Sequence, residues 1–316
     1  MTVPTNTLQT YQSTYNAEDV SNIIFNVSPV DTPLLSMSQR NKAEATYTEW
    51  PIESLSAVDG NNANIEGDDA TIDASTTPTR VGNYCQLMDK TVSITTTQDA
   101  IHKYGAKEEF ARQKVKKGRE LKRDMETIML ANQARVVGAA GTAQKMRSMG
   151  SWLTTNVSRG ATGASGSATT AATDGTQRNF TEALLKGVIV SCITNANDLP
   201  NMILAGPANR ANLSSQLSGN TTRFYELKDG TLNASLTVYR SDYGPLKLAM
   251  DRFQRDRDMW LINTDMIGIR TLEPMQYVDL ARTGLTNKGQ MWTNFTLQVS
   301  NEAAHGVLAD LNTAVL

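Results

Sequence analysis

Short stretches of alternating apolar and polar residues run through the chain, and this period of two is typical of half-buried β-strands. Two of them, at 43–50 and 81–97, flank a polar tip and predict a long two-stranded hairpin. Short apolar runs follow in the C-terminal half. They predict strands at 201–205, 236–239, 246–250, 259–263 and 266–271, and a long alternating strand within 290–311.

Apolar residues at three- and four-residue steps predict helices at 17–27, 99–137 and 180–196, and a short helix through Leu213 and Leu217. The longest of these runs contains no proline, and it predicts a helix of roughly 55–60 Å with Asp99 as its N-cap. The first run carries Val20, Ile23, Ile24 and Val27 on one face. We interpret the polar residues 1–41 as an arm that lies on another surface.

Residues 139–178 are of low complexity, and Gly, Ser, Ala and Thr dominate their central part, 158–175. This composition predicts a flexible loop. For such a segment to be ordered, residues outside it must hold it in place.

Composition limits the size of the core. Of the 316 residues, 40% are hydrophobic and only 6% aromatic, so the chain can bury one or two modest cores. Much of the polypeptide must therefore be extended, solvated or ordered by another chain. The formal charge of −2 disfavours a protein that coats nucleic acid through bulk positive charge.

The charges are unevenly distributed. Segment 42–79 holds one base and eight acids, a formal charge of −7, and segment 99–135 holds ten bases and six acids, a formal charge of +4. We therefore expect the acidic hairpin of one subunit to lie over the basic helix of its neighbour; the alternative is that both faces are simply solvated. The expected contact residues are Glu49, Glu53, Glu66, Asp68 and Asp69 on the hairpin, and Lys107, Arg112, Lys114, Lys116 and Lys117 on the helix.

A second charged cluster is predicted in the C-terminal half. Asp251, Asp256 and Asp258 alternate with arginines along 251–258, so salt bridges explain them better than a cation site does. The cluster predicted here consists of Arg252, Arg255, Asp256 and Arg257.

Motifs of catalysis are missing from the sequence. It contains no GxSxG, GxxxxGK[ST], GxGxxG or HExxH pattern. His102 and His305 are interpreted as surface or interface residues, and Cys85 and Cys192 as reduced, half-buried cysteines. The sequence predicts no catalytic residue, no metal site, no cofactor, no secretory signal and no membrane span.

The order of these parts resembles the major capsid proteins of tailed bacteriophages with the Hong Kong 97-type fold, and is most similar to head proteins of podoviruses and related phages. The phrases that carry the resemblance are Tyr47–Trp50 and Val81–Tyr84 at the hairpin, Lys90–Ile94 after it, Met202–Pro207 behind a helix, and Asp279–Gly284, Lys288 and Val299–Glu302 near the C-terminus.

The resemblance implies an α+β fold with an N-terminal arm (1–41), an extended E-loop hairpin (42–92) and a peripheral domain with a long spine helix (93–138). A flexible loop (139–177), an axial domain (178–272) and the returning strands of the peripheral domain (273–316) follow. Some relatives join subunits by Lys–Asn crosslinks, but no motif singles out Lys42 or Lys90, so no crosslink is predicted.

The implied function is structural. The chain is expected to assemble with itself, as hexamers and pentamers, into an icosahedral capsid that encloses double-stranded DNA without reading its sequence. Assembly is expected in the host bacterial cytoplasm and the product in the virion, with portal, scaffold or decoration proteins as possible further partners and no membrane. The alternatives are the shell of a cellular nanocompartment with the same fold, and a soluble hydrolase or binding module.

Overall fold

The computed structural model describes residues 31–56, 58–63, 65–67, 69, 72, 75, 77–103, 108–196, 198–220 and 238–314. The predicted helix at 17–27 lies outside these residues. The helices are α1 (Pro33–Met37), α2 (Thr96–Ala100), α3 (Glu109–Met129), α4 (Met149–Trp152), α5 (Glu182–Ala196) and α6 (Pro207–Asn220), with a 3₁₀ turn η2 (Glu302–Ala304). The strands are β1 (Gln39–Lys42), β2 (Tyr47–Ile52), β3 (Thr79–Tyr84), β4 (Gln86–Thr95), β5 (Val157–Ser158), β6 (Met202–Ala205), β7 (Val238–Ser241), β8 (Gly244–Met250), β9 (Met259–Ile262), β10 (Ile267–Leu280), β11 (Thr286–Val299) and β12 (Gly306–Leu308).

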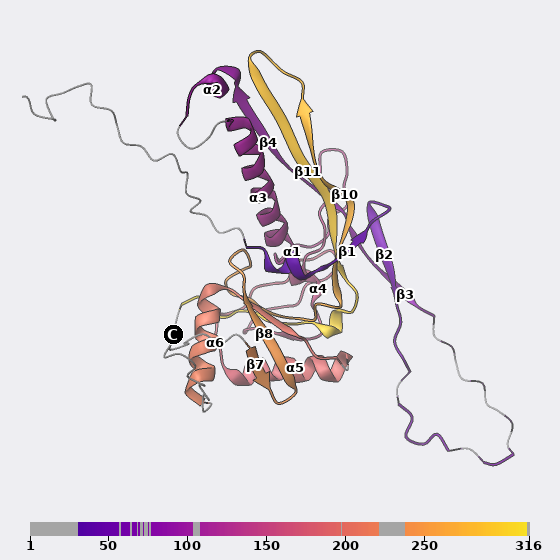
Figure 1. Ribbon diagram of the computed structural model, residues 1–316. Helices are drawn as coiled ribbons and strands as arrows, with labels where there is room; N and C mark the ends of the chain where they lie inside the picture. The colour runs from indigo at the N-terminus through magenta and orange to yellow at the C-terminus, as the bar shows by residue number, and fades with distance from the viewer. Residues whose placement is uncertain are drawn as a thin grey trace, which may run out of the picture.

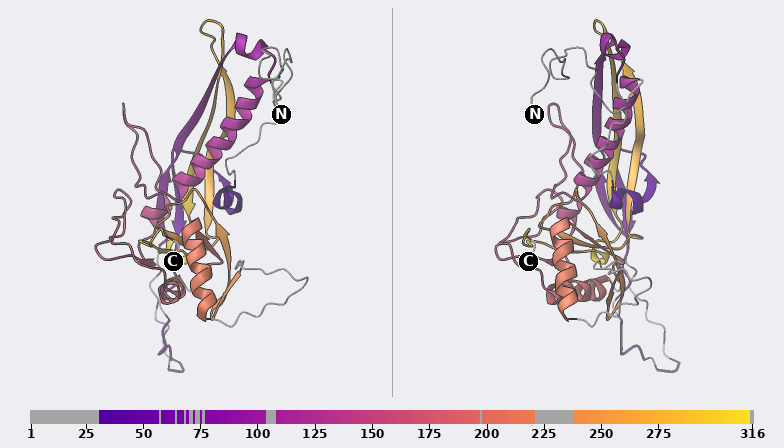
Figure 2. Two further views of the ribbon diagram at one scale, coloured as in Figure 1. Left: turned by 90° about the vertical axis from the view of Figure 1, so that its left-hand side faces the viewer. Right: turned by 60° about the vertical axis from the view of Figure 1, so that its left-hand side comes forward.

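An elongated peripheral unit is built on a four-stranded sheet of order β1-β10-β11-β4. Strands β10 and β11 form a long antiparallel hairpin, β4 pairs antiparallel with β11, and β1 pairs parallel with β10. Helix α3 packs along β4 and β11, so helix and hairpin run side by side (Figure 1; Figure 2). The long C-terminal strand predicted by alternation is confirmed as β11.

A compact axial unit is built on a six-stranded mixed sheet of order β5-β12-β9-β6-β8-β7. Its central strands β6 and β9 are buried along their whole length, because both faces of the sheet are covered. One face contributes Ile203, Ala205, Met259 and Leu261 to a core shared with α5 and α6. The other face contributes Met202, Leu204, Trp260 and Ile262 to the core beneath the peripheral unit. The predicted helix at 180–196 is confirmed as α5.

The core beneath the peripheral unit joins the two units. Leu121, Met125 and Met129 of α3 pack in the same cluster as Trp260 of β9 and Phe295 of β11, and all five side chains are buried. The apolar stripe of the C-terminal half of α3 therefore fixes the spine helix on the axial unit.

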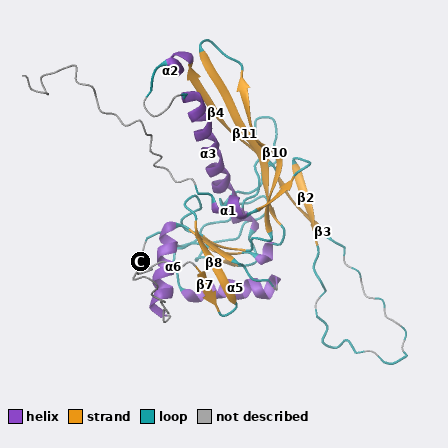
Figure 3. Cartoon of the chain, in the orientation of Figure 1, coloured by secondary structure: helices purple, strands orange, loops and turns teal. Residues whose placement is uncertain are grey.

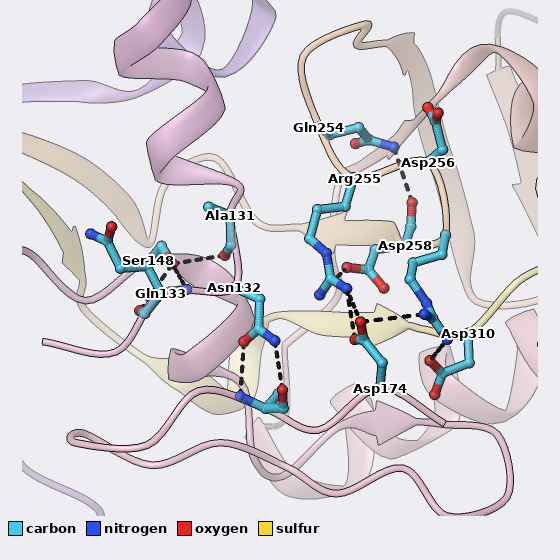
Figure 4. Close-up of polar contacts among 12 residues, drawn as sticks. Ala131, Asn132, Gln133, Ser148, Asp174, Gln254, Arg255, Asp256, Asp258 and Asp310 are labelled. Atoms are coloured by element: carbon cyan, nitrogen blue, oxygen red, sulfur yellow. Dashed lines mark hydrogen bonds and ion pairs between the residues drawn. The ribbon is translucent and has the colours of Figure 1, made fainter. Parts of the chain in front are cut away.

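The spine helix is shorter than predicted. Helix α3 ends at Met129, about 31 Å from its start, and a separate short helix, α2, precedes it. The Asp99 carboxylate accepts a hydrogen bond (3.1 Å) from the backbone N–H of Glu109, so Asp99 caps α3 from across the break. Beyond the helix, the Ser148 hydroxyl accepts a hydrogen bond from the Gln133 N–H and donates one to the Ala131 carbonyl (Figure 4). The chain leaves the helix because these backbone groups bond to a distant serine.

The predicted single strand at 81–97 divides into two. Residues 79–84 pair with β2, whereas 86–95 pair with β11, so the chain changes sheets at Cys85. Two further segments join a sheet outside the unit assigned by the resemblance. β12 lies in the axial sheet although 273–316 were expected to be peripheral, and β1 lies in the peripheral sheet although 1–41 were expected to form the arm.

The low-complexity segment follows a defined path over the axial unit, drawn mostly as loop in Figure 3. The Asn132 side chain donates to the carbonyl (2.6 Å) and accepts from the N–H (2.8 Å) of Ala172. Isolated bridges pair Ala164 with Thr173 and Arg178 with Leu311. Residues outside the segment hold it, and they belong to the same chain.

Candidate assembly surfaces

The root of the E-loop hairpin is fixed to the body by buried polar contacts. The Trp50 side chain is buried and its Nε1–H donates to the Val299 carbonyl (3.0 Å). The Asn83 amide donates to the carbonyls of Arg147 and Leu297 (both 2.9 Å) and accepts from the Arg147 N–H (2.7 Å). Because every one of these partners lies outside the hairpin, the direction in which it leaves the body is set at its base.

The described part of the tip exposes large apolar side chains. Beyond Ile52 the chain extends away from both units (Figure 1). The exposed fractions are 97% for Leu55, 99% for Val58, 78% for Ile65 and 95% for Ile72. Four aliphatic side chains this exposed on one excursion leave apolar area that contact with another molecule would bury.

The predicted acidic contact residues lie along the same hairpin. Glu49 on β2 lies 3.8 Å from Arg80 on the opposite strand, both exposed. Glu53, Glu66 and Asp69 are exposed beyond the strands. Asp68 lies outside the described residues. Figures 1 and 2 place the hairpin well away from α3 of its own chain, so an acid–base contact between them has to come from another copy.

Three of the five predicted basic residues have partners within the chain. Arg112 pairs with Glu109, and this contact lowers the pKa of the Glu109 carboxyl to about 2. The Lys117 ammonium lies 2.7 Å from Glu120. The Lys114 ammonium lies 3.4 Å above the ring of Tyr277 on β10. Their charges are therefore partly satisfied before any second chain approaches.

Lys116 is exposed and, with Arg119 and Lys122, forms what we call the spine stripe. Steps of three residues place these side chains on one side of α3, and none of them makes an ion pair with the residues that the structure describes. Lys107 lies outside the described residues. The spine stripe is the part of the helix whose positive charge remains available to a partner.

The predicted axial cluster exists, with different acids (Figure 4). Arg255 pairs with Asp174 (2.6 Å) and Asp258 (3.2 Å), and Arg257 pairs with Asp174 (3.3 Å) and Asp310 (2.6 Å). Arg252 and Asp256 were predicted members, but both are exposed and neither forms an ion pair with the described residues. Their inclusion was wrong because spacing along one loop does not show which side chains face the body.

Asp310 connects this cluster to the low-complexity segment. Its carboxylate is fully buried and accepts hydrogen bonds from the backbone N–H groups of Gly160 (3.0 Å) and Gly175 (2.9 Å) as well as from Arg257. Arg257 also donates to the Gly175 carbonyl (2.6 Å). One carboxylate therefore ties two turns of the glycine-rich segment to the end of the axial sheet.

His305, Cys85 and Cys192 are buried. His305 is fully buried within the chain, which corrects its interpretation as a surface or interface residue; its Nδ1 accepts from the Asn263 N–H (3.2 Å), and burial lowers its pKa to about 4. Burial raises the pKa of the Cys192 thiol to about 12. Both cysteines are fully buried, deeper than expected.

The residues that the structure describes contain no helix that is both long and apolar enough to cross a bilayer. Within the same ranges, no three His, Cys, Asp or Glu side chains gather in a way that fits a metal ion.

The sequence analysis did not anticipate the apolar tip, the roles of Asp174 and Asp310 in the axial cluster, or the burial of Glu126. The signal for the tip was present, since isolated aliphatic residues alternate with the acids at 53–73. Glu126 also had a signal, because it falls on the apolar stripe of α3 and is fully buried. No sequence signal marked Asp174 or Asp310. Asp174 lies 81 residues from Arg255, and Asp310 lies 53 residues from Arg257.

Comparison with known proteins agrees with this geometry. The model of the SU10 major capsid protein family matches residues 4–312. The major capsid protein of Escherichia phage Phieco32 is 40% identical over 116 residues, a match that covers 36% of this chain and 33% of that relative.

Solved structures share the fold at low identity. The capsid asymmetric unit of Cyanophage A-1(L) superposes with a TM-score of 0.65 at 13% identity, covering 96% of this chain and 99% of that one. The SrpI encapsulin of Synechococcus elongatus superposes with a TM-score of 0.54 at 11% identity, covering 94% and 93%. The expected α+β fold of phage capsid proteins is thereby confirmed.

An extended hairpin, a spine helix beside a long sheet, and an axial unit define the class of phage major capsid proteins. Within that class, the chain belongs to the SU10 major capsid protein family, whose model spans nearly its whole length.

Proposed function

We propose that this chain assembles with copies of itself, as hexamers and pentamers, into a closed icosahedral shell that encloses the double-stranded DNA of a tailed phage. The observation that carries the proposal is the E-loop tip, where four aliphatic side chains are more than three-quarters exposed on a hairpin that extends from a rigid root. Repeated contacts between copies supply the burial that one chain lacks. Assembly takes place in the host bacterial cytoplasm.

The E-loop of one subunit lies over the spine helix of its neighbour in this proposal. Glu53, Glu66 and Asp69 on the hairpin are exposed acids, and the spine stripe offers exposed bases. Each exposed pair contributes only about 0–1 kcal/mol, so the charges set register and assembly rate more than final stability. The apolar tip residues supply most of the buried area.

DNA is enclosed without being read. The chain is nearly neutral, so phosphate contacts are few and sensitive to salt. The role is structural and needs no cofactor and no catalytic residue. A portal, scaffold or decoration protein would bind the assembled lattice. The cellular nanocompartment shell is the second candidate, favoured by the likeness to an encapsulin; the phage family match over residues 4–312 favours the first.

Reversing two charges of the spine stripe tests the E-loop contact. The variant Lys116→Glu with Arg119→Glu should remain folded, because both side chains are exposed, but should assemble roughly tenfold more slowly at low salt. Light scattering and electron microscopy measure shell formation. Lys114, Arg112 and Lys117 are left unchanged, since their partners lie within the chain.

Two comparisons make this test specific. Lys145→Glu with Lys247→Glu changes the net charge equally at exposed sites on other elements and should assemble like the parent. Adding Glu53→Lys and Glu66→Lys to the spine variant should restore assembly. Equal shell yields from the parent and the spine variant at low salt would leave both faces as solvated surfaces and contradict the contact.

DNA binding by the unassembled subunit should be weak and indifferent to sequence. Fluorescence anisotropy with several labelled duplexes should give similar affinities that fall steeply between 50 and 200 mM salt, as general phosphate contacts do. A strong preference for one duplex sequence would contradict the enclosing role.

A further inference from the structure

A groove of about 330 Å³ lies beside the spine helix, at the junction of α1, α3 and the peripheral sheet. Its apolar wall is formed by Leu35 of α1, Met125 of α3, and Ile269 and Met275 of β10. Thr271, Pro274 and Thr293 complete the lining, and Arg40 and Lys122 stand at its rim.

The groove lies at the edge of the area that α3 covers. The helix packs mainly on β4 and β11. Near its start, Phe110 and Lys114 also contact Tyr277 of β10, whereas β1 is at the edge of the sheet farthest from β4. The pairing of β10 with β11 shifts register between Glu273 and Gln276. A bulge that contains Pro274 locally bends the strand beside the groove.

The rim of the groove is positively charged. Arg40 and Lys122 are both exposed, and neither forms an ion pair with the described residues. Lys116 and Arg119 continue the positive charge along α3. An occupant of the groove should therefore present several aliphatic side chains and carry negative charge.

The chain's own arm has this chemistry. Residues 17–27 place Val20, Ile23, Ile24 and Val27 at helical spacing, with Glu18 and Asp19 at the start of the segment. Before Arg40 the sequence contains three acids and neither lysine nor arginine. Side chains of this kind match an apolar floor with a basic rim.

The connection between arm and groove is short. Leu35 of α1 already forms part of the groove wall, and five residues, 28–32, separate Val27 from the start of α1 at Pro33. An extended connection of that length spans at most about 22 Å, enough for the segment to turn back over the same chain. Asp31, the first residue that the structure describes, lies two residues before α1.

We propose that residues 17–27 bind in this groove of their own chain, with Ile23 and Ile24 on the apolar wall and Glu18 and Asp19 near Arg40 and Lys122. The arm thereby covers the groove, and the spine residues Lys116 and Arg119 remain accessible to a neighbouring hairpin. The inference concerns a contact within one chain and does not rest on shell formation.

Disulfide trapping tests whether residues 17–27 bind in the groove. The double variant Ile24→Cys with Met275→Cys should form an intrachain disulfide under mild oxidation, seen as a faster-migrating monomer on a non-reducing gel and confirmed by peptide mass mapping. The native cysteines are buried and give no background. Ile24→Cys with Leu285→Cys is the matched control, because Leu285 is exposed at the far end of the β10–β11 hairpin and should remain unlinked.

Charge reversal tests whether Arg40 and Lys122 at the rim attract the acids of the arm. Arg40→Glu with Lys122→Glu should slow the Ile24–Met275 cross-link roughly tenfold, and Glu18→Lys with Asp19→Lys should restore it. Since Met275 is only partly buried, a second readout uses Met275→Cys alone. Its labelling by a soluble maleimide should be slow in the full chain and at least roughly tenfold faster when Ile23→Asp and Ile24→Asp are added.

Three results would overturn the proposal. Cross-linked dimers in place of monomers would place the arm on another copy. A faster cross-link in Ile65→Cys with Met275→Cys would assign the groove to a neighbour's hairpin. Equal labelling of Met275→Cys with and without the arm substitutions would show that the arm does not cover the groove.

Discussion

Asp310→Ala should lower the free energy of unfolding by about 3–5 kcal/mol, the cost of removing one partner from a buried ion pair. The substitution leaves Arg257 without its 2.6 Å partner, and the N–H groups of Gly160 and Gly175 without an acceptor. Urea denaturation followed by tryptophan fluorescence measures the loss. Asp310 also has a left-handed backbone, with φ of 60°, which alanine adopts less readily than aspartate does.

The loss of stability in Asp310→Ala should appear first as local opening of the low-complexity segment. With the Asp310 carboxylate gone, limited proteolysis should cut within 158–175 faster than elsewhere. Asp310→Asn keeps one acceptor oxygen and should lie between alanine and the parent. Asp256→Ala is the matched control: Asp256 is an exposed acid of the same region without an ion pair to the described residues, so its cost should stay within about 0.5 kcal/mol. Similar losses for Asp256→Ala and Asp310→Ala would refute the anchoring role.

Glu126→Gln should change how stability depends on pH. The Glu126 carboxyl is buried on α3, where it accepts hydrogen bonds from the N–H groups of Leu34 (2.7 Å) and Leu35 (2.8 Å). Burial, and then the nearby Asp251 carboxylate, raise the pKa of Glu126 to about 8. Burial also raises the pKa of Asp251. The two carboxyl groups thus share a proton across the junction of the spine helix and the axial unit.

The direction of the pH effect follows from proton counting. Between the ordinary carboxyl pKa of 4.5 and about 8, the folded chain holds a proton on Glu126 that the unfolded chain releases. The free energy of unfolding therefore falls as pH rises through this window and levels off above it. A glutamine does not titrate, so this decline should be much smaller in the variant, by on the order of a few kcal/mol.

The two stability curves should cross. At pH 5 the variant should be less stable by about 1 kcal/mol, because the amide NH₂ cannot accept from one of the two α1 N–H groups. At pH 9 it should be the more stable of the two. Denaturant titrations from pH 5 to 9 measure both curves. His305 contributes in the opposite direction, because its lowered pKa makes the free energy of unfolding rise with pH below about 6.5. This contribution is the same in both proteins, so subtracting one curve from the other removes it.

A surface carboxyl provides the control for this prediction. Glu120→Gln removes an acid whose pKa is lowered by its hydrogen bond to Lys117, so it should leave the decline between pH 5 and 8 intact. Parallel curves for the parent and Glu126→Gln would mean that Glu126 stays ionised in the folded chain.

Much of the element order is readable from local periodicity. The alternation within 290–300 predicts β11, and the three- and four-residue steps at 180–196 predict α5. These predictions succeed because each element buries a continuous stripe or face, and that requirement is written into neighbouring residues. The excess of acids on the hairpin and of bases on the helix is equally local. The resemblance to phage capsid proteins could be stated for the same reason, since it rests on the order of such elements.

Pairing between distant residues was decided only by the tertiary structure. The spine helix ends at Met129 because Ser148 bonds to the backbone at 131 and 133, although apolar periodicity continues further. The low-complexity segment is held by Asn132 and Asp310. Arg255 pairs with Asp174 and Arg257 with Asp310, although Asp256 is nearer to both arginines in the sequence. Hydrogen bonds and ion pairs depend on where the chain brings two groups in space. Sequence alone therefore determined the longer periodic elements, such as α5 and β11, whereas the packed fold determined where elements end, which short ones form and what they bind.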